Sequence, residues 1–254
     1  RIPGKEEFFE TLRYFTHQLA ECGVHLHLSS EQSVDSLRAG HFDEVVLATG
    51  IVPRPLSLPG VEHAKVLNYL DVLRDNKTVG KSVAIIGAGG IGFDVAEFLV
   101  EHESLSVKPE AWLKSWGIDK NYQNPGALMV ADVDAPEREI YLLQRKTSKV
   151  GKGLGKTTGW VHRSCLQRKN VQMIPGVEYV RIDDEGLHVV LNEQARCLAV
   201  DNVILCAGQV PLRALQAGLL AHNITTHLIG GADVAAELDA KRAIRQGAEL
   251  AAKI

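Results

Sequence analysis

The 254-residue sequence predicts an α/β protein built on a parallel β-sheet. Short apolar runs, of which residues 83–86 are the clearest, have the length and composition of strands buried on both faces. Segments with apolar side chains three and four positions apart alternate with these runs, as do helices that cover a parallel sheet. A hydrophobic content of 45% and a charged content of 23% are ordinary for a globular chain and supply a sizeable core.

The N-terminal part of the chain predicts one helix and two strands. Residues 6–22 place apolar side chains at helical spacing, and Gly23 follows as a stop signal. Residues 24–30, VHLHLSS, alternate between apolar and polar and predict a short strand. Residues 44–48 predict a buried strand that leaves through a segment rich in glycine and proline.

The remaining elements follow from the same patterns. A strand at 83–86 leads through a glycine-rich turn into a helix that reaches Leu99. Residues 103–138 have weak periodicity, three prolines and two tryptophans, Trp112 and Trp116. That segment is either a plain surface excursion or an interdomain or substrate-facing surface. After it we expect a strand at 139–146, a lysine-rich loop, a helix at 159–170, a short strand at 171–176, an antiparallel three-stranded meander at 177–200, a strand at 201–211, a further strand, a glycine turn and a terminal helix.

Composition and cysteine usage exclude several classes of function. A net charge of −3 gives no reason to expect nucleic acid or an anionic membrane surface as a partner. The sequence has no run of 18 apolar residues and no signal-peptide pattern in RIPGKEEFFETL. Four cysteines without a Cys-x-x-Cys pair and ten histidines without ligand spacing predict no metal site and a cytoplasmic, reducing compartment. Cys197 and Cys206 fall in predicted strands, where we expect buried thiols.

Residues 81–99, KSVAIIGAGGIGFDVAEFL, contain the motif G-x-G-x-x-G between a strand and a helix. Gly87 permits the tight turn, Gly89 lets a pyrophosphate approach the backbone, and Gly92 lets helix and strand pack closely. The amides of Gly90 and Ile91 then lie at a helix N-terminus, which favours anions. The pattern predicts a dinucleotide site. The alternative is a glycine-rich turn that holds no nucleotide.

The end of the next strand indicates which dinucleotide is bound. A carboxylate there would bind ribose hydroxyls, whereas a basic residue suits a 2′-phosphate. The strand IYLLQ ends in Arg145 and Lys146, with three further lysines close behind and no carboxylate. NADPH is therefore favoured over NADH and FAD. The alternative is that these basic residues form a solvated loop.

Two segments repeat one pattern. FDEVVLATGIVPR and DNVILCAGQVPLR each give an acidic turn, four apolar residues, a glycine and a proline. With IGGADV before the terminal helix, they resemble the flavoprotein reductases of the glutathione-reductase-like superfamily. In that superfamily an NAD(P)-binding domain is inserted in an FAD-binding domain. The resemblance implies a Rossmann-like parallel sheet with an antiparallel meander at 66–212, and FAD-binding segments at 1–65 and 213–254.

A narrower resemblance rests on GKEEFFETLRYF, NYLDVLRD, LLQRKTSKVGKGLGKTTGWVHR and AAELDAKRAIRQG. These segments resemble the C-terminal part of the bacterial NADPH-dependent 2,4-dienoyl-CoA reductases, relatives of trimethylamine dehydrogenase and the old-yellow-enzyme-like barrels. The resemblance implies that the chain is a C-terminal fragment whose first FAD-binding βαβ unit lies upstream of Arg1. An N-terminal barrel of the same polypeptide would then hold FMN, a 4Fe-4S cluster and the catalytic residues, with none in this chain.

The resemblance also assigns residues to cofactors. For NADPH it adds Arg163 to Arg145, Lys146 and the glycine motif; a surface arginine is the alternative for Arg163. For FAD it implies Lys5 and Gln32 at the adenosine end, and at the flavin end Gly231, Asp233, Leu238, Asp239 and Ala240. The implied function is the electron-entry half of a 2,4-dienoyl-CoA reductase in the oxidation of unsaturated acyl-CoA. The alternatives are another FAD- and NAD(P)-dependent reductase and a non-catalytic NADP-binding module.

Overall fold

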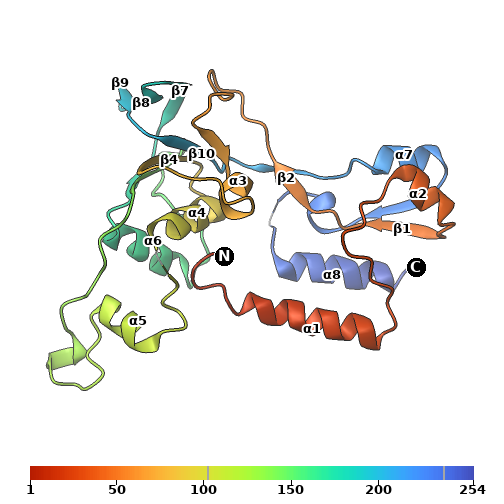
Figure 1. Cartoon of the computed structure of the whole chain (residues 1–254), viewed down its shortest axis with the longest axis horizontal. Helices are drawn as coiled ribbons and strands as arrows, with labels where there is room; N and C mark the ends of the chain where they lie inside the picture. The colour runs from red at the N-terminus through yellow and green to blue at the C-terminus, as the bar shows by residue number, and fades with distance from the viewer. Residues whose placement is uncertain (102, 237) are drawn as a thin grey trace. The chain divides into compact units, whose positions relative to one another are not determined.

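A computed structural model describes residues 1–101, 103–236 and 238–254 and confirms the α/β class (Figure 1). The chain divides into two compact units. Unit 1 comprises Arg1–Thr16 and Leu56–Ala207, and unit 2 comprises His17–Pro55 and Gly208–Ile254. The nucleotide-binding domain limits expected near residues 66 and 212 stay a prediction. No helix in the described part of the chain is long and apolar enough to cross a membrane.

Unit 1 is built on a five-stranded sheet in the order β3-β10-β4-β5-β6, in which every neighbouring pair is parallel. In this sheet Ile86 of β4 lies beside Leu143 of β5 and Leu205 of β10. The carboxyl ends of the three central strands therefore share one edge. In the sheet, β5 and β6 lie on one side of β4, whereas β10 and β3 lie on its other side. The direction in which successive strands are placed therefore reverses at β4. The strand bounds are Val66–Asn68 for β3, Ser82–Ile86 for β4, Glu139–Leu143 for β5, Gln172–Ile174 for β6 and Asn202–Leu205 for β10.

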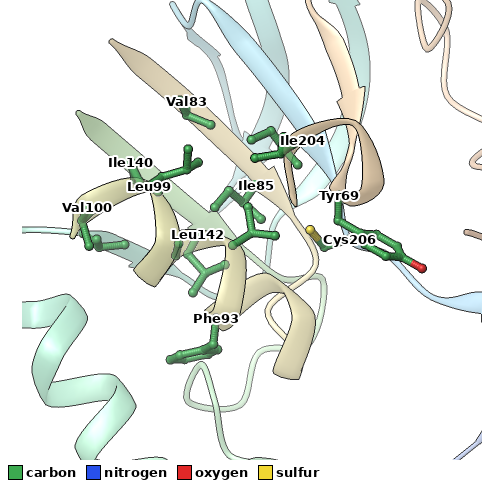
Figure 2. Packing of buried hydrophobic residues seen from close by; sticks show 14 of the residues in the cluster. Tyr69, Val83, Ile85, Phe93, Leu99, Val100, Ile140, Leu142, Ile204 and Cys206 are labelled. Carbon is green, nitrogen blue, oxygen red and sulfur yellow. The ribbon is translucent and has the colours of Figure 1, made fainter. Parts of the chain in front are cut away.

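Strand β4 is buried on both faces, as its apolar run predicts. Val83 and Ile85 contact the helical side, in the cluster that contains Phe93 of α4 (Gly90–Val100), and Figure 2 shows this packing. Ala84 and Ile86 belong to the cluster on the opposite face. This alternation is the period of two expected of a strand, and it explains why the run contains no polar residue.

Helices cover one face of the unit 1 sheet and the meander covers the other. The buried cluster on the helical side joins α4 to α3 (Tyr69–Leu73) and α6 (Gly159–Arg168). The cluster on the other face includes residues of the predicted antiparallel meander, β7 (Glu178–Asp183), β8 (Gly186–Leu191) and β9 (Gln194–Leu198). The meander is thereby confirmed.

The expected burial of Cys197 is wrong. Its strand, β9, is the edge of the meander and most of its side chains are exposed, so the thiol of Cys197 is exposed too. Cys206, directly after β10, is buried as predicted, and burial raises its pKa.

The segment 103–138 contains a helix, α5 (Pro109–Trp116), that its weak periodicity does not reveal. Proline at the first position and Gly117 in the left-handed conformation at the end are its sequence signals. Trp116 anchors the segment on α6: its ring lies 6.1 Å from that of Trp160, and the Arg168 guanidinium lies 4.3 Å from its centre. Residues 125–127 form a 3₁₀ turn, η1 (Pro125–Ala127).

Unit 2 holds two small sheets. β1 (Glu44–Leu47) and β12 (Thr225–Leu228) form a parallel pair, and β2 (Ile51–Pro53) and β11 (Gln209–Pro211) an antiparallel pair. The two repeated segments thus meet through their exits, because β2 and β11 follow the two glycines of the repeat. Val45 and Leu47 pack with Leu219 beneath α2 (Val34–Ala39) and α7 (Gln216–Ala221), whereas the alternate residues of β1 are exposed.

Two further helices expose every one of their residues at least in part. They are α1 (Phe8–Glu21), predicted from its spacing, and α8 (Ala240–Ala251), which follows the 3₁₀ turn η2 (Gly230–Ala232). On α1, the exposed fractions of Phe9 and Leu12 are 65% and 64%.

The predicted strand at 24–30 is wrong. The described residues place no strand beside this segment, and Ser29 has φ of +52°, outside the extended region. Alternation alone cannot hold a strand, because its backbone N–H and C=O groups need a neighbouring strand as partner. His25 and His27 are therefore loop residues.

Candidate dinucleotide-binding site

The turn between β4 and α4 is fixed by the ends of the neighbouring strands. The amide of Gly87 donates to Leu143 O of β5 at 2.9 Å, and the amide of Cys206 donates to Ile86 O at 2.8 Å. Gly87 has φ of +112°, and a Cβ added there would lie 2.7 Å from Cys206 O. Only glycine meets both demands, since a side chain would be strained and would push against the backbone after β10.

The other glycines of the turn divide into one that is packed and two that are open. A Cβ on Gly92 would lie 1.9 Å from Gly87 O, so α4 rests directly on the turn. A Cβ on Gly89 or Gly90 would meet nothing within 4 Å. Gly89 also caps α4 without any side-chain hydrogen bond. The amides at the start of α4, with Ile91 among its first residues, are thus left for an external acceptor, and the helix dipole favours an anion there.

The end of β5 presents Arg145 and Lys146 from a fixed backbone. The side-chain amide of Gln144 donates to Lys146 O at 2.9 Å and to Ser148 O at 2.5 Å, and Gly176 N donates to Lys146 O at 3.0 Å. The side chains of Arg145 and Lys146 are exposed and have no ion-pair partner among the described residues. Because β5 lies beside β4, both cations are carried at the edge of the sheet where the glycine turn lies.

Arg163 holds the glycine- and lysine-rich loop rather than pointing to solvent. Its Nη1 donates to Gly151 O at 2.9 Å. Gly151 in turn packs on the ring of Phe93, since a Cβ added at Gly151 would be 2.7 Å from Phe93 Cζ. Phe93 is itself buried, with 1% of its surface exposed. The loop, α6 and the helix of the glycine motif are thereby joined, and Figure 2 shows Phe93 projecting from α4.

A cluster of charged side chains along α4, which includes the buried Glu97, was not predicted from the sequence. Lys5 Nζ lies 2.6 Å from Asp94 Oδ2, and His162 Nδ1 lies 2.6 Å from Glu97 Oε1. The hydrogen bond to Glu97 raises the pKa of His162. Lys5, which the resemblance assigns to FAD, thus lies in unit 1 against the helix of the glycine motif. The spacing of Asp94 and Glu97 on one helix face is the only trace of the cluster in the sequence.

Several residues assigned to FAD gather where η2 meets α8 in unit 2. Asp233 Oδ2 accepts from Gln246 Nε2 at 2.8 Å, and Asp239 Oδ1 accepts from Arg242 N at 2.7 Å, which caps α8. Gly231 belongs to η2 and Ala240 is the first residue of α8. The side chain of Leu238 is 43% exposed.

Gln32 is not part of this group. Its side chain contacts Ser30 of its own loop and Ser36 in the first turn of α2. It lies two residues before α2, and no described contact joins it to η2 or α8.

Arg242 in the first turn of α8 is a residue that sequence reasoning missed. Its Nη2 donates to Val234 O at 2.7 Å, which ties α8 to the turn before it. Its Nε is buried and has no hydrogen-bond partner among the residues that the structure describes. A buried N–H without an acceptor is costly, so a ligand atom at this point would satisfy it.

Comparisons with known proteins agree with the α/β fold, with its parallel sheet and antiparallel meander. A family model described as pyridine nucleotide-disulphide oxidoreductase matches residues 16–229. The metal reductase of Desulforamulus reducens is 26% identical over 220 residues, which are 81% of this chain and 30% of that protein. The cinnamate reductase of Clostridium sporogenes is 35% identical over 103 residues, 39% of this chain and 15% of that protein.

A solved structure extends the similarity over nearly the whole chain. The complex of 2-naphthoyl-CoA reductase with 2-naphthoyl-CoA has a TM-score of 0.77 at 22% identity, covering 98% of this chain and 32% of that one. At this identity the match shows the fold. In each of these three comparisons the matched region is less than a third of the larger protein.

Proposed function

Because this chain belongs to the pyridine nucleotide-disulphide oxidoreductase family, we propose that it is the electron-input portion of an NADPH-dependent flavoprotein reductase. NADPH binds at the β4–α4 turn and FAD binds at η2 and α8. The whole protein reduces a 2,4-dienoyl-CoA, with FMN and a 4Fe-4S cluster in an additional barrel domain of the same polypeptide.

The observation that carries this proposal is that the four glycines of the turn have two different environments. Gly87 and Gly92 are packed against backbone, whereas Gly89 and Gly90 face open space in front of uncapped amides. A pyrophosphate fits that arrangement, because it supplies both the negative charge and the acceptors. Arg145 is exposed, and its guanidinium suits a 2′-phosphate, which it can bind through two parallel hydrogen bonds.

The residues at η2 and α8 also fit an anionic or acceptor-rich cofactor. Within the described part of the chain, Arg242 offers a buried Nε without a partner, and the N-terminus of α8 offers backbone donors, of which Asp239 caps the amide of Arg242. Bound NADPH would supply a hydride and bound FAD would accept it. The chain's own part is to hold the phosphates, orient the two cofactors and supply cationic groups near their charges.

Two observations support a conjugated thioester as substrate of the whole protein. The chain resembles 2,4-dienoyl-CoA reductases in the segments around Arg145, Arg163 and Asp239. Two of its similar proteins are named for cinnamate and for 2-naphthoyl-CoA, both of which carry a carbonyl group conjugated with a carbon–carbon double bond.

Titration of the purified protein with NADPH and NADH, alone and with added FAD, tests the proposal. We expect tighter binding of NADPH than of NADH, and flavin absorbance that bleaches when NADPH is added to the FAD-loaded protein. NADPH binding without any binding of FAD would instead support a non-catalytic NADP-binding module. Activity of the whole protein with 2,4-dienoyl-CoA, set against cinnamoyl-CoA and a saturated acyl-CoA, tests the substrate class.

A further inference from the structure

We propose that the hairpin of β8 and β9 carries a binding site for a divalent metal ion of the zinc type, formed by Glu185, His188 and Cys197. The sequence contains no spacing that indicates a metal site, and the site arises from strand pairing. In the register of β8 with β9, His188 lies opposite Cys197. Glu185 stands in the preceding turn, three residues before His188.

The three ligand atoms are close enough to share one ion. His188 Nε2 lies 3.7 Å from Cys197 Sγ and 3.8 Å from Glu185 Oε2, and all three donor atoms lie within 4.8 Å of one another. In a tetrahedral zinc site, bonds of about 2.0–2.3 Å place neighbouring ligand atoms about 3.5 Å apart. Small side-chain movements of exposed Glu185 and Cys197 therefore complete the geometry.

The chemistry of the three donors favours zinc over calcium or magnesium. A thiolate and an imidazole are ligands of borderline or soft ions, whereas calcium and magnesium take oxygen atoms. With three protein ligands the fourth position is left to water, as in zinc sites that are open to solvent.

The surroundings of His188 balance charge around the site. Asp183 Oδ1 also lies 2.8 Å from His188 Nε2, so the hydrogen bond between them is exchanged for a bond to the metal ion when Nε2 becomes a ligand. Arg181 Nε contacts Oδ2 of the same carboxylate at 2.9 Å and remains its partner when Nε2 binds the metal ion.

Titration of the untagged, reduced protein with Co²⁺ tests the site directly, because a cobalt–thiolate bond gives a charge-transfer band in the near ultraviolet. We expect one equivalent of Co²⁺ to produce the band and Zn²⁺ to displace it. Cys197→Ser should abolish the band, and His188→Gln should weaken binding by more than the roughly 10- to 100-fold that loss of an outer-shell partner costs. Cys22→Ser, which removes another exposed thiol, is the matched control and should retain the band.

Two further measurements keep the result decisive. Without metal, Cys197→Ser and Cys22→Ser should melt at the wild-type temperature because both thiols are exposed, whereas His188→Gln also loses the contact with Asp183. Zn²⁺ should raise the melting temperature only where Cys197 and His188 are present. Absence of the band in the wild type, or a band that survives Cys197→Ser, would overturn the proposal. The site is independent of nucleotide binding, so NADPH affinity should be the same in Cys197→Ser as in the wild type.

Discussion

Alanine at Gly92 and at Gly89 should separate the packing role of the glycine turn from its binding role. At Gly92 an added Cβ would lie 1.9 Å from Gly87 O, and real Cβ contacts essentially never fall below 3.0 Å. The helix and the turn must therefore separate by about 1.1 Å, the difference between those two distances. Because the opposing atom belongs to the backbone, we place the cost at about 2–3 kcal/mol, near the upper end of overpacking effects.

For a unit of this size the cost at Gly92 corresponds to a melting temperature lower by about 5–10 °C. Gly89→Ala should behave in the opposite way. Gly89 has φ of −85° and ψ of −171°, which alanine adopts without strain, and an added Cβ meets nothing within 4 Å. Its melting temperature should equal or slightly exceed the wild-type value, since alanine reduces the freedom of the unfolded chain.

Nucleotide binding should show the reverse order. The methyl group of Gly89→Ala occupies the open space where we place the pyrophosphate. Loss of one charged hydrogen bond there costs about 1.5–3 kcal/mol, a roughly tenfold or greater loss of NADPH affinity. Thermal unfolding followed by circular dichroism and NADPH titration by calorimetry measure the two effects. A Gly92→Ala protein as stable as the wild type, or a Gly89→Ala protein that binds NADPH unchanged, would refute the reasoning.

Three further substitutions test other parts of the structure. Arg145→Ala should weaken the binding of NADPH by about 1.5 kcal/mol, roughly tenfold, in calorimetric titration, and should leave NADH binding and the melting temperature unchanged. The control Arg196→Ala, at another exposed arginine, should change neither affinity. Equal losses for both nucleotides would contradict the 2′-phosphate role of Arg145. The hydrogen bond to Glu97 raises the pKa of His162 above 6.5. The contribution of this bond to the stability of the protein is therefore fully present below pH 6.5 and is lost as the pH rises through the folded-state pKa. Over this range the melting temperature of the wild type should fall relative to that of His162→Gln, and parallel curves would count against the pair. Arg242→Met should lower FAD affinity in a fluorescence titration and leave NADPH affinity unchanged, and an unchanged FAD affinity would remove Arg242 from the flavin site.

The central part of unit 1 is predictable from sequence because its signals are local. The apolar run of β4, the three glycines and the helix after them form one continuous segment, 82–100, in which each feature agrees with the others. The meander is predictable for the same reason: its strands and turns follow one another directly, so alternation and turn residues coincide.

Features that depend on distant partners escape this reasoning. Residues 24–30 alternate like a strand, but no described strand pairs with them. Cys197 looks like a strand residue with a buried side chain, but β9 is an edge strand of the meander. The contact between Lys5 and Asp94 joins residues 89 positions apart. No local sequence pattern predicts such contacts, because they form only in the tertiary fold.

The residues of the candidate sites likewise divide into those that local sequence predicts and those that only the folded structure shows. Gly87, Gly89, Gly92 and Arg145 were identified by spacing and strand position, and the structure carries them at one edge of the sheet. The buried Nε of Arg242 is visible only once α8 is folded against η2. Whether the assigned residues bind the cofactors stays a prediction until binding is measured.

Paired titrations of the purified protein with NADPH and NADH test the central claim most directly. The glycine turn should bind both nucleotides through the pyrophosphate, and Arg145 should favour NADPH by roughly tenfold, about 1.4 kcal/mol. The preference should shrink with added salt, because exposed charges are screened. Equal affinities for the two nucleotides, or no binding of either, would contradict the account.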